Sequence, residues 1–220
     1  MKTDKIYTLI LVDDHILLRD ALANLINSFE AFRVIAVAGN GKEVIQCFET
    51  DTEADMVLMD LNMPEMDGYA TTHWLVKNRP NIKIVILTMY DTEISLIRLL
   101  RAGVHGFLKK DIHPDELENA LLTVAQGEYY YSNHTALKLV SLFRKDANEA
   151  LKLEKYLLSD TEIEFLKLAS MEMTYKEIAL SMNLSPKAID NFRDILFVKL
   201  GVKSRVGLAI YAIKNGIINF

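Results

Sequence analysis

The chain has 220 residues, of which 50% are hydrophobic, and a formal net charge of −5. This length exceeds the roughly 150 residues of a common domain, so we expect two domains. The apolar runs are far shorter than the roughly 20 residues of a membrane span, which excludes a transmembrane helix.

Charge is distributed unevenly along the chain. Residues 1–150 carry 15 Lys+Arg and 22 Asp+Glu, a net charge of −7, whereas residues 157–220 carry 8 and 7, a net charge of +1. The acidic first part argues against a nucleic-acid-binding surface there. In the second part, DNA binding has to come from the placement of the cations rather than from bulk charge.

The N-terminus and the single cysteine bear on the cellular compartment. The first five residues lead straight into a strand-like segment, without the apolar helix and cleavage site of a signal peptide. Cys47 has no second cysteine to pair with, and its apolar neighbours indicate a packed thiol rather than a nucleophile. We expect a cytoplasmic protein with no membrane partner.

Strand-like and helical segments alternate over residues 1–128. The apolar or β-branched segments are residues 6–12, 32–38, 56–59, 82–88 and 106–108. The helical patterns cover residues 16–29, a stretch after Asn40, a stretch after Gly68, about 92–103 and about 114–125. Such alternation predicts an α/β fold with a right-handed, doubly wound parallel sheet. We expect a flavodoxin-like domain with five parallel strands in the order 2-1-3-4-5.

The next segment, residues 129–156, is predicted to be a helical linker. Residues 135–143 are apolar with a helical pattern, and residues 144–155 are rich in charge and contain neither Gly nor Pro. This composition indicates a partly helical connector rather than a flexible one.

Residues 157–220 predict an all-α domain of four helices. Ser159 with Glu162 and Thr174 with Glu177 have the spacing of capping boxes, and Ser185 precedes a proline. The second and third helices are separated by about three residues, which is typical of a helix-turn-helix unit. The third helix is predicted to end at Gly201, and a fourth covers residues 204–216.

Polar residues end four of the predicted strands: Asp13 and Asp14, Asp60, Thr88, and Lys110. Neighbouring parallel strands bring such ends to one crevice. Two carboxylates about 4 Å apart repel each other by about 4 kcal/mol at a surface-like dielectric, so the cluster calls for a cation. A few oxygen ligands suit Mg²⁺, which also accepts phosphate oxygens. A carboxylate nucleophile, a divalent ion and a lysine are the parts that acyl-phosphate formation needs.

These segments resemble the receiver domain of two-component response regulators. The resemblance rests on Val12 to His15, Met59 to Gly68, Leu87-Thr88 and Gly106 to Asp111. It implies that Asp60 is phosphorylated by a sensor histidine kinase. It further implies that Mg²⁺ is bound directly by Asp14, Asp60 and the backbone carbonyl of Asn62, and through water by Asp13. Thr88 and Lys110 would hold the phosphoryl oxygens, Phe107 would be the switch aromatic residue, and Lys109 would point away.

These residues also allow other interpretations. An acidic pair after a strand is often only a solvated loop. Aspartyl-phosphate phosphatases place a second Asp two residues after the nucleophile, whereas this chain has Asn62, which cannot exchange a proton. We therefore expect no enzyme beyond the chain's own Mg²⁺-dependent phosphorylation and dephosphorylation. The five histidines show no ligand spacing and are interpreted as structural, while Trp74 and Tyr129 to Tyr131 are expected to pack on helix and linker surfaces.

The helical domain resembles the LuxR-type DNA-binding domain, which makes the whole chain similar to response regulators of the NarL/FixJ type. The resemblance rests on Leu158 to Leu166, Thr174 to Ala179, Leu184 to Asp190 and Lys199 to Arg205. It implies that residues 186–200 form the recognition helix in the major groove. The candidate DNA-binding residues are Lys187, Asp190, Asn191, Arg193, Asp194, Lys199, Lys203 and Arg205.

The recognition helix departs from many relatives at Asp190, where they carry a basic residue, and Asp194 follows one turn later. Glu172 also replaces a glycine that is common in the family. Acids repel phosphates but can accept a hydrogen bond from cytosine N4. Alternatively, Arg193 pairs with both acids in a local ion-paired face.

The resemblance also implies that phosphorylation promotes a homodimer that binds operator half-sites, or releases the helical domain. The apolar last helix, residues 206–217, would form the dimer interface, or it packs only inside the domain. A rival function is a phosphorylation-controlled protein-interaction module that has lost specific DNA binding.

Overall fold

The alternating segments of the first part of the chain form one parallel sheet. The structure is a computed structural model that describes residues 5–50, 52–89, 93–132, 158–215 and 217–218. The strands are β1 Tyr7–Val12, β2 Phe32–Ala38, β3 Met56–Met59, β4 Lys83–Thr88, β5 Gly106–Lys109 and β6 Tyr130–Tyr131. Their order, β2-β1-β3-β4-β5-β6, confirms the predicted order of the first five.

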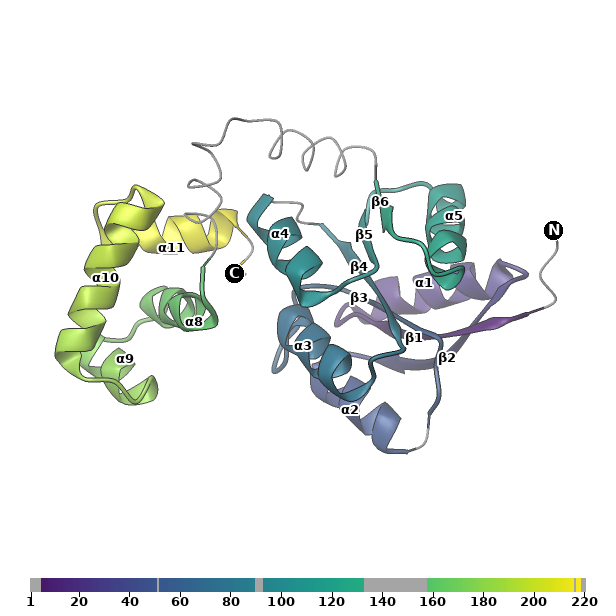
Figure 1. Cartoon of the computed structure of the whole chain (residues 1–220), viewed down its shortest axis with the longest axis horizontal. Coiled ribbons are helices and arrows are strands. Elements are labelled where there is room, and N and C mark those ends of the chain that lie inside the picture. The colour runs from purple at the N-terminus through teal and green to yellow at the C-terminus, as the bar shows by residue number, and fades with distance from the viewer. Residues whose placement is uncertain (1–4, 51, 90–92, 133–157, 216, 219–220) are drawn as a thin grey trace. The chain divides into compact units, whose positions relative to one another are not determined.

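Five helices cover the two faces of this sheet. They are α1 Ile16–Ser28, α2 Gly41–Glu49, α3 Gly68–Asn78, α4 Glu93–Ala102 and α5 Pro114–Ala125. Helices α1 and α5 pack on one face, where Leu9, Leu58 and Leu108 are fully buried. Helices α2, α3 and α4 lie on the other face (Figure 1). Strands β1, β3 and β4 are largely buried on both faces, which explains why these segments are nearly continuously apolar.

Strand β6 is a difference from the prediction of five strands. Tyr130 and Tyr131 pair in parallel with Gly106 and Phe107 of β5, so the sheet continues into the segment assigned to the linker. The hydroxyl of Tyr130 also donates to Glu116 on α5. Two residues are too few to show the alternation by which a strand is found in a sequence. The predicted linker helix at residues 135–143 and the charged stretch after it lie outside the described residues.

Close backbone contact shapes the loop between β3 and α3. A Cβ added to Gly68 would lie 2.7 Å from the carbonyl oxygen of Asp60 and 2.9 Å from Cα of Leu61. The Gly68 N–H also donates to the carbonyl of Leu61. Only glycine allows the start of α3 to approach the end of β3 this closely.

The second compact unit consists of helices α8 Asp160–Ala169, α9 Tyr175–Ser181, α10 Pro186–Leu200 and α11 Arg205–Lys214. Both predicted capping boxes are present, at Ser159 with Glu162 and at Thr174 with Glu177. Ser185 caps α10, and Gly201 ends it with φ of 67°. Phe165, Leu196 and Leu208 are fully buried and join the helices in one core.

No helix within the described residues is long and apolar enough to cross a membrane.

Candidate functional site

Three charged side chains meet at the carboxyl ends of the strands. Lys110 Nζ lies 2.7 Å from Oδ2 of Asp13 and 2.8 Å from Oδ2 of Asp60. The side chains of the three residues are 6%, 2% and 7% exposed. An ammonium group therefore lies between two buried carboxylates and offsets their repulsion.

The sheet register explains this convergence. Val12 is the partner of Met59, so the next residues, Asp13 and Asp60, leave their strands at the same level. The N–H of Asp60 donates to the carbonyl of Val12. On the other side, the N–H of Lys110 donates to the carbonyl of Thr88. The structure thus brings together strand ends up to 97 positions apart in the sequence.

Burial and charge compete at these groups. Burial raises the pKa of the Asp60 carboxyl, and the neighbouring Asp13 raises it further, which together outweigh the opposing effect of Lys110. Burial disfavours the charged form of Lys110, but its hydrogen bonds to Asp13 and Asp60 outweigh this and raise its pKa. Lys110 stays protonated, while Asp60 carries a negative charge that burial makes costly.

Asp14 and His15 lie on the solvent side of the buried pair. The side chain of Asp14 is 33% exposed, and His15 Nδ1 lies 3.0 Å from Asp14 Oδ1 and 3.2 Å from Asp13 Oδ1. The ligand atoms of Asp13, Asp14, His15 and Asp60 all lie within 4.8 Å of one another. His15 was interpreted as structural with the other histidines; its position next to two aspartates was the signal that it belongs to the cluster.

The donor set fits a hard divalent cation. Three carboxylates within 4.8 Å of one another supply the oxygen ligands that Mg²⁺ prefers. The carboxylate of Asp14 is partly exposed, so a cation can enter the site from solvent and keep several of its bound waters. An imidazole such as that of His15 suits a transition metal better than Mg²⁺, which prefers oxygen ligands.

The loop after Asp60 fixes its carboxylate. The N–H of Leu61 donates to Asp60 Oδ1 at 2.7 Å, which leaves Oδ2 facing Lys110. Glu65 has φ of 61°, and the next N–H donates back to the carbonyl of Pro64. Nδ2 of Asn62 is a buried donor with no hydrogen-bond partner among the described residues.

The two residues predicted to respond to the ligand are completely buried. Thr88 and Phe107 each have 0% exposure. Thr88 is the register partner of Lys109, the neighbour of Lys110, whereas Phe107 lies three residues before Lys110 on β5, opposite Ile86 of β4. Lys109 Nζ lies 3.7 Å from Asp111 Oδ2, whereas Lys110 Nζ contacts the acidic cluster.

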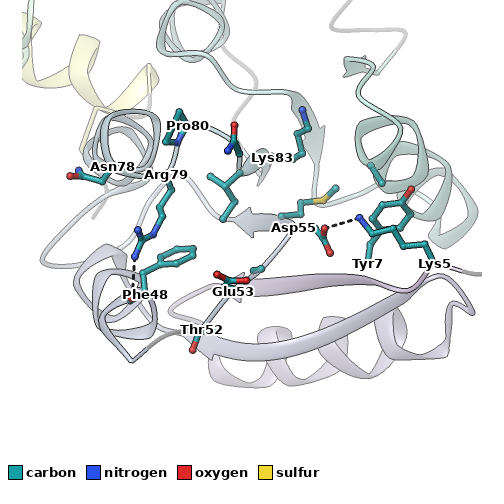
Figure 2. Close-up of a pocket in the computed structure, with 15 residues that line it drawn as sticks. Lys5, Tyr7, Phe48, Thr52, Glu53, Asp55, Asn78, Arg79, Pro80 and Lys83 are labelled. Atoms are coloured by element: carbon teal, nitrogen blue, oxygen red, sulfur yellow. Dashed lines mark hydrogen bonds and ion pairs between the residues drawn. The ribbon is translucent and has the colours of Figure 1, made fainter.

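A pocket of about 700 Å³ lies at the opposite edge of the sheet, around the amino ends of β1, β3 and β4 (Figure 2). Three of its charged side chains are engaged within the protein: Lys5 pairs with Asp55 at 3.0 Å, and Arg79 donates to the carbonyl of Phe48 at 3.1 Å. We interpret this pocket as a structural junction between loops, since the cluster of reactive groups lies at the other edge.

On the helical unit, two predicted DNA contacts are engaged internally. Lys199 Nζ lies 2.7 and 2.8 Å from the two carboxylate oxygens of Glu162 on α8. Arg205 donates through Nε to the carbonyl of Ala169 and through Nη2 to that of Met171. These cations fasten α10 and α11 to the end regions of α8. Their roles in the fold could not be read from charge and spacing.

The other candidates lie on the outer face of α10 or just after it. Lys187, Asp190, Asn191, Asp194 and Lys203 are exposed. The guanidinium of Arg193 lies 2.9 Å from Asp190 Oδ1 and 2.8 Å from Asp194 Oδ1, which is the ion-paired face considered as an alternative. It also lies over the ring of Tyr175, 5.4 Å from the centroid. The hydrogen bond to Asp194 raises the pKa of Arg193, so this cation is permanent.

Comparisons with known proteins find relatives of both parts of the chain. A family model for the response regulator receiver domain matches residues 9–122, and one for bacterial regulatory proteins of the luxR family matches residues 156–212. The oxygen regulatory protein NreC of Staphylococcus aureus is 32% identical over 216 residues, which cover 96% of this chain and 99% of NreC.

Solved structures show the same likeness. Response regulator ChrA of a heme-sensing two-component system is 27% identical, with a TM-score of 0.53 over 97% of this chain and 99% of that one. RcsB of Salmonella enterica serovar Typhimurium, bound to the promoter rprA, is 23% identical, with a TM-score of 0.70 over 94% and 98% of the two chains. At that identity, RcsB supports the fold alone.

Proposed function

The chain belongs to the response regulators that join a receiver domain to a LuxR-type DNA-binding domain, and on this basis we propose that phosphorylation of Asp60 controls its binding to DNA. The observation that carries the proposal is the ion-paired arrangement of Asp13, Lys110 and Asp60 at the carboxyl ends of the strands. The proposed domains are residues 1–128, a connector over 129–156 and residues 157–220, with Tyr130 and Tyr131 contributing an edge strand to the first.

Phosphorylation is a transfer from the phosphohistidine of a sensor kinase. Oδ2 of Asp60 attacks the phosphorus, the phosphorus–nitrogen bond breaks, and the histidine keeps the electron pair. The ammonium group of Lys110 lies 2.8 Å from the attacking oxygen. It forms ion pairs with the phosphoryl oxygens as they arrive. Leu61 N–H holds Oδ1 of Asp60 and orients the nucleophile. Asn62 supplies no second acid, so the chain turns over no other phosphate ester.

Asp13, Asp14, Asp60 and the backbone carbonyl of Asn62 would hold Mg²⁺. When bound, the ion neutralises charge that develops on the phosphoryl oxygens. The residues themselves divide the work: the carboxylates of Asp13 and Asp14 position the ion and Lys110 balances the buried charge.

The phosphoryl group changes the packing of two buried residues, Thr88 and Phe107. Thr88 moves toward the new oxygens, and Phe107 rotates into the space that Thr88 leaves. Both side chains are at 0% exposure, so neither can move alone without opening a void or a clash. Such coupling makes the face formed by α4, β5 and α5 bistable.

The output is a homodimer on paired operator half-sites. Val206 and Ile210 on α11 are 67% and 47% exposed and lie one helical turn apart, which supports an intermolecular contact through this helix. Leu208 and Ala212 on the same helix are buried in the core, so α11 serves both roles on different faces. Exposed Lys187, Asn191 and Lys203 are the proposed DNA contacts, and a regulator that binds DNA would act in the cytoplasm.

One observation favours a second function. Val198 is 80% exposed and Ile195 is 53% exposed on α10, beside two aspartates. An apolar and acidic helix face suits a protein partner better than a phosphate backbone. The second candidate is therefore a phosphorylation-controlled interaction module.

Selection from a random DNA library tests the two functions. The full chain is used with and without a small-molecule phosphodonor and Mg²⁺, beside Asp60→Asn. Enriched paired half-sites that require the phosphodonor and Asp60 support the main proposal. Phosphorylation-dependent self-association without enriched DNA supports the interaction module, and stoichiometric phosphate uptake by Asp60→Asn refutes the assignment of Asp60.

A further inference from the structure

The outer face of α10 presents carboxylates where a DNA reader usually presents cations. Residues 187, 190, 191, 194 and 198 recur at helical spacing and are all exposed. In helix-turn-helix domains the N-terminal residues of the second helix face base edges. Here that half of the face carries Lys187, Asp190, Asn191 and Asp194.

Arg193 holds both carboxylates in a defined orientation. It contacts Oδ1 of Asp190 through Nη1 and Oδ1 of Asp194 through Nε and Nη2. Within the described residues, Oδ2 of either aspartate accepts no hydrogen bond. Asp190 and Asp194 remain 57% and 64% exposed. Each therefore offers one oriented acceptor oxygen to a ligand above the helix.

The arrangement also limits the electrostatic cost of approaching DNA. The guanidinium offsets one of the two negative charges, and it is engaged within the protein by both aspartates and by the ring of Tyr175 on α9. The group as a whole has a charge of −1 and accepts hydrogen bonds rather than donating them. A ligand must therefore supply donors.

In the major groove, cytosine N4 and adenine N6 are the amino donors. Adenine places the acceptor N7 beside its donor, which an ionised carboxylate repels, whereas cytosine presents the amino group alone. Building on the proposed function, we propose that Asp190 and Asp194 each accept a hydrogen bond from N4 of a cytosine, so that each operator half-site requires C·G pairs at the two positions that these residues face.

The test compares the sequences selected by the phosphorylated full chain and by two variants. Asp190→Asn replaces a pure acceptor by an amide that accepts and donates, which pairs with adenine N6 and N7. We expect the preferred base at one position of each half-site to change from cytosine to adenine, while the other positions stay the same. Glu164→Gln removes the same charge from an exposed site on α8, and we expect it to leave the selected sequence unchanged.

A second measurement uses the unaltered protein and is independent of any effect of the substitution on folding. The selected cytosine is replaced by 2-pyrimidinone, which lacks the N4 amino group, opposite the same guanine. We expect affinity to fall by at least about fivefold at the positions read by Asp190 and Asp194, as for a mismatched base pair. The same replacement at a cytosine outside the half-site should leave affinity unchanged.

The outcomes separate this inference from the proposed function. Enriched DNA whose base preference is unaffected by Asp190→Asn and by loss of N4 overturns the inference and leaves a DNA-binding regulator in place. It would mean that the acids only hold Arg193. Absence of any enriched DNA removes the proposed function, and the inference with it.

Discussion

Glu162 accepts a hydrogen bond from the N–H of Ser159 at 2.7 Å. The same carboxylate forms an ion pair with Lys199 at 2.7 Å. One side chain thus closes the first turn of α8 and ties it to the C-terminal end of α10. The side chains of Glu162 and Lys199 are 11% and 20% exposed, so solvent screens this pair less than a surface pair.

We therefore expect Lys199→Met to lower the free energy of unfolding of the helical domain by about 1–2 kcal/mol, because Glu162 loses its buried partner. Thermal unfolding of the full chain measures the change. Lys187→Met on the same helix is the control: Lys187 is exposed and its substitution should change stability by less than about 0.5 kcal/mol. DNA binding should show the opposite pattern. The dependence of affinity on salt concentration should become weaker in Lys187→Met and stay unchanged in Lys199→Met. Equal slopes in the two variants would contradict this division of roles.

Asp60→Asn is expected to stabilise the receiver domain at neutral pH. The raised pKa of Asp60 means that the folded state binds this proton more tightly than the unfolded chain does. Its contribution to stability is therefore greatest below about pH 4 and is lost as the pH rises through the folded-state pKa. The stability difference between Asp60→Asn and the unaltered chain should grow from pH 4 toward pH 7 in urea unfolding. A difference that shrinks over this range would show that Lys110, rather than burial, dominates.

Mg²⁺ should stabilise the receiver domain in a manner that depends on Asp14. A ligand that binds only the folded state at ten times its dissociation constant contributes about 1.4 kcal/mol. We expect the melting temperature to rise with Mg²⁺ in the unaltered chain, and the rise to be lost in Asp14→Asn. Asp115→Asn, an exposed acid on α5, provides the matched control and should keep the full response. Calorimetric scans with EDTA give the baseline; equal responses in the two variants would place the ion elsewhere.

Gly68→Ala should lower stability by about 1–3 kcal/mol and slow phosphorylation. The added Cβ meets backbone atoms of Asp60 and Leu61 at 2.7 and 2.9 Å, and backbone cannot yield as a side chain can. Gly39→Ala is the control, since there a Cβ meets only side-chain atoms of Arg19 and Glu43 at 3.4 and 3.5 Å. Chemical denaturation and the rate of phosphodonor uptake measure the two effects. Similar losses in both variants would mean that the contact at Gly68 is not special.

Local signals predicted most of the fold. An apolar strand that ends abruptly predicts the site at Asp60. The fixed spacing between Ser159 and Glu162, and between Thr174 and Glu177, predicts the two capping boxes. Such features depend on residues close in the sequence, and the strand order follows from the regularity of alternating α/β chains.

Long-range pairing is what the sequence did not reveal. Nothing near Lys199 indicates that Glu162, 37 positions earlier, occupies it. Arg205 similarly donates to carbonyls at the end of α8, which no charge pattern encodes. Cations that look equivalent in the sequence therefore divide into those that hold the fold and those left on the surface, such as Lys187.

The short strand β6 has a mechanical consequence. Phe107 and Tyr131 are register partners, so the aromatic residue expected to move pairs across the sheet with a residue at the start of the segment predicted as the connector. An edge strand of two residues is held by few hydrogen bonds, so it can separate from the sheet at a small cost in free energy. We expect a repacking of Phe107 to loosen Tyr131, so that a change at the phosphorylation site would reach the edge of the sheet, at the start of the segment that leads to the second domain.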